Sequence, residues 1–126
     1  MQKKCILVVD DDTLNLMRTQ KILEQSYDVL LAESGKEALA LLPRHKVDLV
    51  LLDIAMPKMD GIETFERMKA LPVKDFPAKL PVIFLTASGD ADDVMRAIEL
   101  GAVNYLKKPF FPEELLKRVT KELDEQ

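Results

Sequence analysis

Three consecutive aspartates occupy residues 10–12, directly after an apolar run, and a fourth, Asp53, ends another apolar run. Clustered carboxylates are costly at neutral pH unless a cation compensates their charge. Oxygen ligands with no histidine or cysteine beside them favour a hard cation. If Asp10, Asp11 and Asp53 converge in the fold, we therefore expect a site for Mg²⁺, with Mn²⁺ or Ca²⁺ as alternatives.

A lysine after the last apolar run could complete this site for phosphoryl chemistry. Three carboxylates, one lysine and one Mg²⁺ sum to zero charge, and a phosphate dianion on one carboxylate would leave a single negative charge. Phosphoryl transfer uses a metal, a cationic side chain and an in-line nucleophile. A carboxylate can be that nucleophile and form an acyl phosphate. These residue types predict a metal-dependent phosphoryl site.

The elements that must position these side chains alternate along the chain. Short β-rich apolar runs predict strands at residues 5–9, 29–32, 47–52, 82–86 and 103–106. Most of them are continuously apolar, which is typical of strands covered on both faces. Helical patterns lie between the runs, so the five β–α units predict a parallel sheet with helices on both faces and right-handed crossovers.

The ligands of such sheets bind beyond the carboxyl ends of the strands. Asp10 and Asp11 follow the first predicted strand and Asp53 ends the third, so they converge if those two strands are neighbours. Thr86 ends the fourth predicted strand, and a pair of lysines follows the fifth. The chemistry is therefore expected at one edge of the sheet.

Glycine, proline and capping residues predict the helix boundaries. Ser34 and Glu37 have the spacing of a capping box, in which each side chain accepts a hydrogen bond from the other residue's backbone amide. The remaining signals predict a helix ending at Pro43, one opening at Gly61, one from Gly89 to Leu100 with a C-cap at Gly101, and one with Pro112 in its first turn.

The chain has the size and composition of one soluble domain. Its 126 residues suffice to bury a core without disulfides, and its single cysteine, Cys5, cannot form an internal one. A net charge of −4 argues against a nucleic-acid-binding surface. No apolar run approaches the roughly 18 residues of a membrane span. We expect a single cytoplasmic domain over residues 1–126, without direct contact to nucleic acid or membrane.

Four motifs occur in order along this pattern: VVDD at residues 8–11, LLDIAMPKMDG at 51–61, FLTAS at 84–88 and YLKKPF at 105–110. Together with the five β–α units, they resemble the receiver domain of two-component response regulators, in the CheY-like superfamily. The resemblance covers nearly the whole chain. It implies a flavodoxin-like (βα)5 fold, a doubly wound α/β sandwich whose five-stranded parallel sheet has the order 2-1-3-4-5.

The resemblance implies a role for each residue of the acidic site. Asp53 is the phosphoacceptor, Asp11 is a direct Mg²⁺ ligand, and Asp10 acts mainly through a bound water. Asp53 and the backbone carbonyl of Ala55 complete the protein's share of the metal shell. The implied cofactor is Mg²⁺.

The same resemblance implies a phosphoryl-binding set and a switch. Lys108 pairs with the phosphoryl group, while the Thr86 hydroxyl and the Ala87 backbone contact it. The side chains of Thr86 and Tyr105 move together on activation. The Lys108–Pro109 peptide bond is cis in such domains.

Partners also follow from the resemblance. The phosphodonor is the phosphohistidine of a sensor histidine kinase or of a histidine phosphotransfer protein. Phosphorylation of Asp53 changes the face formed by the fourth helix, fifth strand and fifth helix. That face then binds a downstream output domain or protein, or a second copy of the chain as a homodimer. Such a domain catalyses only its own phosphorylation and dephosphorylation, so it is not a conventional enzyme.

Two regions depart from the family's pattern. Ala55 stands where many members carry a polar side chain, and with Ser88 it flanks the path of the hydrolytic water, so small residues border that path. Phe111 stands where the family often has a helix-capping residue. The last helix must then rely on Pro112 and the glutamates of its first turn.

Simpler roles remain open for several neighbouring residues. Asp12 is interpreted as a solvated residue or a cap of the first helix, with Thr13 competing for the cap. Adjacent residues that leave a strand face opposite ways, and the family's Lys-Pro pair favours Lys108 over Lys107 for the site. Asn15 could order the acidic site or be an ordinary polar surface residue.

Two other functions share parts of this pattern. A Mg²⁺-dependent phosphatase with an aspartyl nucleophile usually has a second aspartate two residues further on, where this chain has Ala55. A flavodoxin-like nucleotide-binding module needs a loop rich in Gly, Ser or Thr after its first strand. Three aspartates in that place would repel a phosphate, so the receiver interpretation fits the residues better.

Overall fold

Five parallel strands form one sheet in the order β2-β1-β3-β4-β5 in the computed structural model, which describes residues 3–72, 80–86, 91–102 and 104–124. The strands are β1 (Cys5–Val9), β2 (Asp28–Ala32), β3 (Leu49–Asp53), β4 (Val82–Thr86) and β5 (Asn104–Lys107). The helices are α1 (Thr13–Leu23), α2 (Gly35–Leu41), α3 (Gly61–Met68), α4 (Ala91–Leu100) and α5 (Pro112–Asp124), with a 3-10 helix at Leu42–Arg44. The predicted flavodoxin-like α/β fold and its strand order are confirmed.

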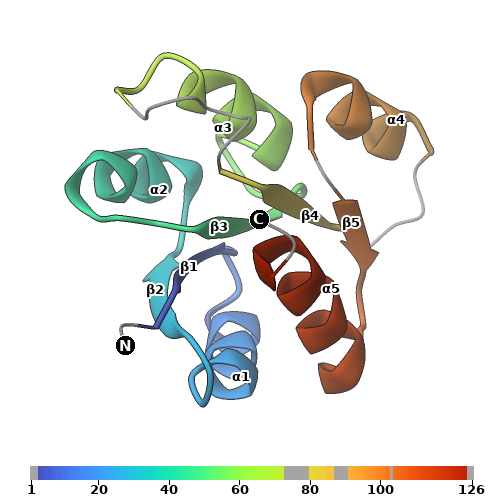
Figure 1. Cartoon of the computed structure of the whole chain (residues 1–126). Coiled ribbons are helices and arrows are strands. Elements are labelled where there is room, and N and C mark those ends of the chain that lie inside the picture. The colour runs from blue at the N-terminus through green and yellow to red at the C-terminus, as the bar shows by residue number, and fades with distance from the viewer. Residues whose placement is uncertain (1–2, 73–79, 87–90, 103, 125–126) are drawn as a thin grey trace.

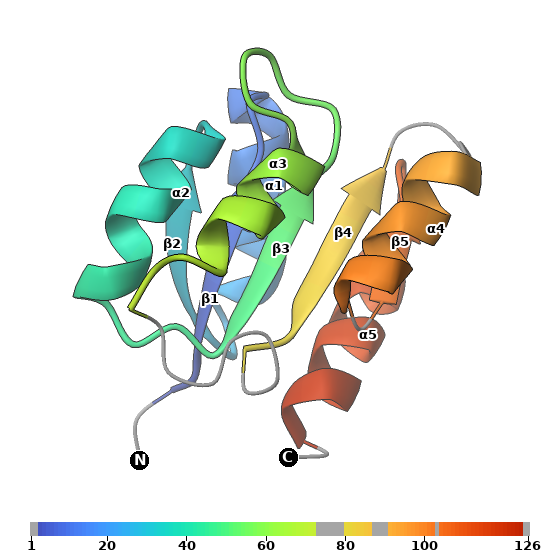
Figure 2. The ribbon, with the colours of Figure 1, turned by 90° about the horizontal axis from the view of Figure 1, so that it is seen from above.

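Helices cover both faces of the sheet (Figure 1; Figure 2). Helices α2, α3 and α4 lie on one face and supply Ala38, Phe65 and Ala97 to its core. Helices α1 and α5 lie on the other face, where Leu16 and Val119 belong to a second core cluster. The doubly wound arrangement follows from strands that are apolar on both faces.

Burial differs between the middle and the edges of the sheet. All residues of β3 and β4 are buried, as are the last four of β1, which agrees with their continuous apolar sequences. The edge strands β2 and β5 are only partly buried. No helix of the described residues is long and apolar enough to cross a membrane.

The register of the central strands aligns their carboxyl ends. Val9 pairs with Leu52 across β1 and β3. The next residue after each of them, Asp10 and Asp53, therefore lies beside the other. Val9 also pairs with Ala32, and the Asp10 amide donates to the Ala32 carbonyl at 3.1 Å, which extends the ladder one step beyond β1. The sheet itself therefore positions the two carboxylates.

Side-chain caps begin the helices that leave this edge. Asp12 Oδ1 accepts hydrogen bonds from the amides of Leu14 and Asn15 at 2.9 and 3.3 Å, so Asp12, and not Thr13, is the N-cap of α1, which is one of the two roles left open for it. Asp60 caps α3 by accepting from the Glu63 amide at 2.8 Å. Each cap fixes the first turn of a helix next to the acidic residues.

The predicted capping box of α2 is half correct. Ser34 Oγ accepts from the Glu37 amide at 3.1 Å, as expected. The Glu37 carboxylate, however, accepts from the amide of Glu33 at 3.4 Å rather than from that of Ser34. The side chain reaches one residue further back along the extended segment that follows β2 than the motif requires.

Some element boundaries also differ from the predicted ones. Strand β3 begins at Leu49, which pairs with Ile6, the second residue of β1, and not at residue 47. Strand β5 ends one residue later than predicted, and its predicted first residue, Val103, lies outside the described residues, as does Gly89. Gly101 has a φ of 110°, which agrees with its predicted place at the end of α4.

Candidate functional site

Three aspartates lie together beyond the carboxyl ends of β1 and β3. One carboxylate oxygen each of Asp10, Asp11 and Asp53 lies within 4.8 Å of the others. Asp10 and Asp53 are buried, with 2% and 3% of their surfaces exposed, whereas Asp11 is exposed. The structure thus brings together the three aspartates selected from the sequence, with one of them open to solvent.

Lys108 reaches this cluster from the segment after β5. Its Nζ lies 2.7 Å from Asp10 Oδ2 and 3.3 Å from Asp53 Oδ2. The neighbouring Lys107 is exposed, as expected from the alternation of side chains along a strand. The Lys108–Pro109 bond is cis, as the resemblance implied. One ammonium group therefore bridges the two buried carboxylates.

Backbone amides orient the carboxylates toward the lysine. Asp10 Oδ1 accepts from the Asp12 amide at 2.9 Å, and Asp53 Oδ1 accepts from the Ala55 amide at 3.3 Å. In each case the other oxygen, Oδ2, faces Lys108. The carboxylates are held in place before any ligand arrives.

The charges of the site are unevenly balanced. The pKa of Asp53 is raised to about 6, because burial, which raises it most, and the neighbouring Asp10 together outweigh the lowering by Lys108. Burial disfavours the Lys108 ammonium, but its hydrogen bond to Asp10 and the attraction of Asp53 outweigh this and raise the pKa of Lys108. Lys108 therefore stays charged, and its single positive charge is opposed by the carboxylates of three aspartates.

A divalent cation fits this donor set. All three side chains offer hard oxygen ligands, and no histidine or cysteine belongs to the group. The two positive charges of the cation would compensate the two carboxylates that Lys108 leaves unbalanced. Ala55, whose carbonyl was the fourth predicted ligand, is exposed beside the cluster.

The turn after Asp53 is packed tightly against the site. The Gly61 amide donates to the Ile54 carbonyl at 2.8 Å, and a Cβ on Gly61 would lie 2.3 Å from the Asp53 carbonyl oxygen. Lys58, in the same turn, has a φ of 69°. Only glycine fits at residue 61, and a lysine occupies a left-handed conformation that side chains rarely adopt.

The predicted switch residues lie in neighbouring strands. Thr86 is buried at the end of β4, and its carbonyl accepts from the Lys108 amide at 2.7 Å. Tyr105 lies in β5 opposite Phe84 and is 41% exposed. Ala87, for which a backbone contact was predicted, and Ser88 lie outside the described residues.

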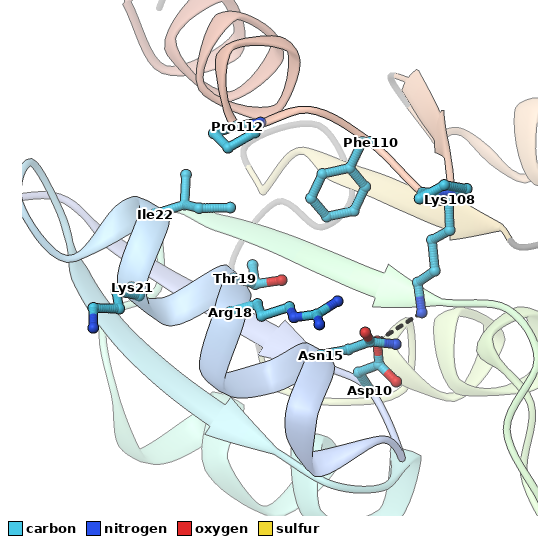
Figure 3. Close-up of a pocket in the computed structure, with 10 residues that line it drawn as sticks. Asp10, Asn15, Arg18, Thr19, Lys21, Ile22, Lys108, Phe110 and Pro112 are labelled. Atoms are coloured by element: carbon cyan, nitrogen blue, oxygen red, sulfur yellow. Dashed lines mark hydrogen bonds and ion pairs between the residues drawn. The ribbon is translucent and has the colours of Figure 1, made fainter.

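A groove that the sequence did not predict opens beside the acidic cluster (Figure 3). It lies between α1 and the segment from Lys108 to Pro112, and its volume is about 770 Å³. Its lining includes Arg18, Thr19 and Phe110, and it reaches Asp10 and Lys108 at one end. No local motif encodes it, because α1 and this segment meet only in the fold.

Two residues near the groove had been interpreted from the sequence. Asn15 is partly buried and lines the groove beside Asp10, one helical turn before Arg18. The i, i+3 spacing of Asn15 and Arg18 was the sequence signal that the two share a helix face. Phe111 is 76% exposed, and Pro112 is the first residue of α5, with Glu113 and Glu114 in the first turn.

Comparisons with known proteins point to one family. A sequence model of the response regulator receiver domain matches residues 6–120. The chain is 41% identical over 120 residues to the alkaline phosphatase synthesis transcriptional regulatory protein PhoP of Bacillus subtilis, covering 94% of the chain and 48% of that protein. It is 42% identical over 115 residues to the transcriptional regulatory protein CpxR of Klebsiella pneumoniae, covering 90% of the chain and 47% of that protein.

Solved structures agree with the sequence comparison. A response regulator receiver domain protein (CheY-like) from Methanospirillum hungatei matches with a TM-score of 0.89 at 34% identity, covering 98% of this chain and 96% of that one. The chain spans about half the length of the curated relatives it matches.

Proposed function

The chain belongs to the response regulator receiver domain family, and from this premise we propose that it is a phosphoacceptor switch of two-component signalling. Asp53 is the acceptor. The observation that carries this proposal is the position of Lys108 Nζ, 3.3 Å from Asp53 Oδ2, within the cluster of three aspartates. Residues 1–126 act in this proposal as one receiver domain.

The transfer step uses the Asp53 carboxylate as the nucleophile. An Asp53 carboxylate oxygen attacks the phosphorus of a phosphohistidine in line, the phosphorus–nitrogen bond breaks, and the imidazole leaves with the electron pair. Because the pKa of Asp53 is about 6, its carboxylate is mostly ionised at pH 7 and can act as the nucleophile. Lys108 then pairs with the phosphoryl oxygens instead of with the free carboxylate.

Four groups would hold the metal: the carboxylates of Asp10, Asp11 and Asp53 and the carbonyl of Ala55, with Asp10 acting mainly through a bound water. When bound, Mg²⁺ neutralises the charge that develops on the phosphoryl oxygens. Asp10 also holds Lys108 in position through its 2.7 Å contact. The acidic residues thus both attract the cation and place the lysine.

Phosphorylation is proposed to act on the α4–β5–α5 face. The Thr86 hydroxyl and the Ala87 backbone contact the phosphoryl group, and Thr86 moves together with Tyr105. The described part of this face already exposes Met95, Ile98 and Tyr105. An output partner or a second copy of the chain binds there and covers these apolar side chains.

The proposed partners follow from the family and from the relatives. The phosphodonor is a histidine kinase or a histidine phosphotransfer protein in the cytoplasm. The Bacillus and Klebsiella relatives are named transcriptional regulatory proteins and are about twice as long as the matched region. An output domain or protein is therefore proposed for this receiver, which itself contacts neither nucleic acid nor membrane.

Phosphorylation by a small-molecule donor tests the proposal directly. Incubation with Mg²⁺ and acetyl phosphate should add one phosphoryl group to the intact mass, and EDTA should prevent it. Asp53→Asn should abolish the addition, whereas Asp48→Asn, at a carboxylate that binds the Cys5 amide far from the cluster, should not. An unmodified wild-type chain, or equal labelling of Asp53→Asn, would overturn the proposal.

A further inference from the structure

The groove beside the acidic cluster has the volume and the lining of a small-molecule binding site. Its volume of about 770 Å³ lies within the range of roughly 300–1,000 Å³ that is common for small-molecule sites. Such sites are mostly apolar with a few polar groups, and here Ile22, Phe110 and Pro112 form an apolar wall (Figure 3). An apolar body the size of one or two rings would be buried against this wall.

The polar groups of the groove favour an anion. Three cations, Arg18, Lys21 and Lys108, line it against one carboxylate, Asp10, in a chain whose net charge is −4. Lys108 is already paired with Asp10, and Lys21 points away from the groove in Figure 3. Arg18 is therefore the cation that a ligand would meet.

Arg18 is oriented for this role. In Figure 3 its side chain extends from α1 across the groove below the Phe110 ring, toward the end formed by Asn15 and Asp10. The Thr19 hydroxyl points into the same space. Within the described part of the chain, Arg18 forms no salt bridge, unlike Arg67 and Arg96 on the other face. Its guanidinium is thus available to bind a phosphate, carboxylate or sulfonate group through two parallel hydrogen bonds.

We propose that this groove binds a small organic anion, with its apolar body against Ile22, Phe110 and Pro112 and its anionic group on Arg18. The ligand class is a phosphate or carboxylate carried on a ring-sized apolar group. The site is distinct from the phosphoryl site, because Arg18 and Phe110 belong to the groove alone, although Asp10 and Lys108 border both. The proposal does not rest on phosphorylation of Asp53.

Two probes that differ in charge test it. The amide resonances of the labelled protein are followed during titration with naphthalene-2-sulfonate and with neutral 2-naphthol, with Mg²⁺ present to reduce repulsion from the neighbouring aspartates. The sulfonate should shift the amides of Thr19, Ile22 and Phe110 and bind about tenfold more tightly than the naphthol. Inorganic sulfate alone, which lacks the apolar body, should bind more weakly than the sulfonate.

Matched arginine variants locate the anionic contact. Arg18→Gln should weaken sulfonate binding about tenfold and leave naphthol binding unchanged. Arg67→Gln, which removes the same charge from an exposed residue of α3, should change neither affinity. Phe110→Ala should weaken both probes, with its fold checked by circular dichroism. Equal affinity for the two probes, shifts confined to other surfaces, or an Arg18→Gln variant that binds the sulfonate as wild type would each overturn the proposal.

Discussion

Gly61 packs so closely against Asp53 that a Cβ on Gly61 would lie 2.3 Å from the Asp53 carbonyl oxygen and 2.8 Å from the Cα of Ile54. The neighbouring atoms are backbone and cannot turn aside. Gly61→Ala should therefore displace the Asp53 main chain, lower the free energy of unfolding by roughly 1–3 kcal/mol and slow acetyl phosphate labelling. Urea titration and intact-mass kinetics measure the two effects.

Gly101→Ala is the matched control for that variant. Gly101 has a φ of 110° at the end of α4, so alanine there should also destabilise the fold, by about 1 kcal/mol. It lies far from the acidic cluster, so the labelling rate should stay that of the wild type. If both variants labelled at the same rate, the close approach of Gly61 would have no consequence for the site.

The raised pKa of Asp53 predicts that the free energy of unfolding of the metal-free protein depends on pH. Its value moves from 3.8 to about 6, so the native state binds more protons than the unfolded state between these pH values. The free energy of unfolding must then fall as pH rises through this window, by roughly 3 kcal/mol in total. The cost is fully present above pH 6 and is relieved at acidic pH.

Comparison with Asp53→Asn isolates this contribution. In EDTA at pH 7 the variant should be more stable than the wild type, because it lacks the buried charge. The difference should shrink as pH falls from about 6 toward 3.8, where the wild-type carboxyl is neutral too. Urea titrations across this range measure it, and a difference independent of pH would contradict the assigned shift.

Removal of the Lys108 charge should expose the repulsion between Asp10 and Asp53. Lys108→Met leaves two buried carboxylates without their shared cation, which should cost about 3 kcal/mol of stability in metal-free protein. The same change should tighten Mg²⁺ binding, because a competing positive charge is gone. Thermal melts with and without Mg²⁺ measure both effects. Lys107→Met, at an exposed neighbour, should stay within about 0.5 kcal/mol of the wild type.

Asp11 and Asp12 are adjacent carboxylates with different contacts. Asp11→Asn removes a member of the acidic cluster and should weaken Mg²⁺ affinity about tenfold or more in calorimetric titrations. Asp12→Asn removes the same charge but keeps the cap of α1, since asparagine also caps helices well. It should leave both Mg²⁺ affinity and stability nearly unchanged. If both variants lost the same Mg²⁺ affinity, the affinity would depend only on the total negative charge and not on the position of each carboxylate.

Lys58 adopts a left-handed conformation that costs a non-glycine residue roughly 1 kcal/mol. Asparagine tolerates this region better, so Lys58→Asn should raise the free energy of unfolding by about 0.5–1 kcal/mol in urea titrations. Lys58→Ala keeps the Cβ that causes the crowding and should give no such gain. A stabilised alanine variant would point to the lysine charge rather than to the backbone.

The acidic site could be predicted from the sequence because its position depends on strands. Asp10 and Asp53 each follow a continuously apolar run, and parallel strands end at a common edge, so their meeting needed only the correct neighbours. The cap by Asp12 is equally local, since donor and acceptor lie within three residues. Interactions that the chain makes with itself over a few residues, or through a regular sheet, can be read from residue type and spacing.

Features that depend on the meeting of irregular segments could not be predicted. The groove exists because α1 packs beside the segment after β5, nearly a hundred residues away, and no pattern in either one encodes the distance between them. The positive φ of Lys58 is imposed by the turn, because a lysine, like other non-glycine residues, favours a negative φ. The carboxylate of Glu37 bonds the amide of Glu33 because a long side chain has several acceptable partners.

Lys108 is held at both of its ends. Its amide donates to the Thr86 carbonyl of β4 at 2.7 Å, and its ammonium contacts Asp10 beyond β1 at the same distance. Strand β3 lies between β1 and β4 in the sheet, so the two contacts of Lys108 connect strands that are not direct neighbours. The edge strand β5 pairs with β4, and Lys108 adds a second link, to the middle of the sheet. The strength of this second link depends on the charges around Lys108 Nζ. A change of charge at the acidic site therefore changes how strongly β5 is held to the rest of the sheet.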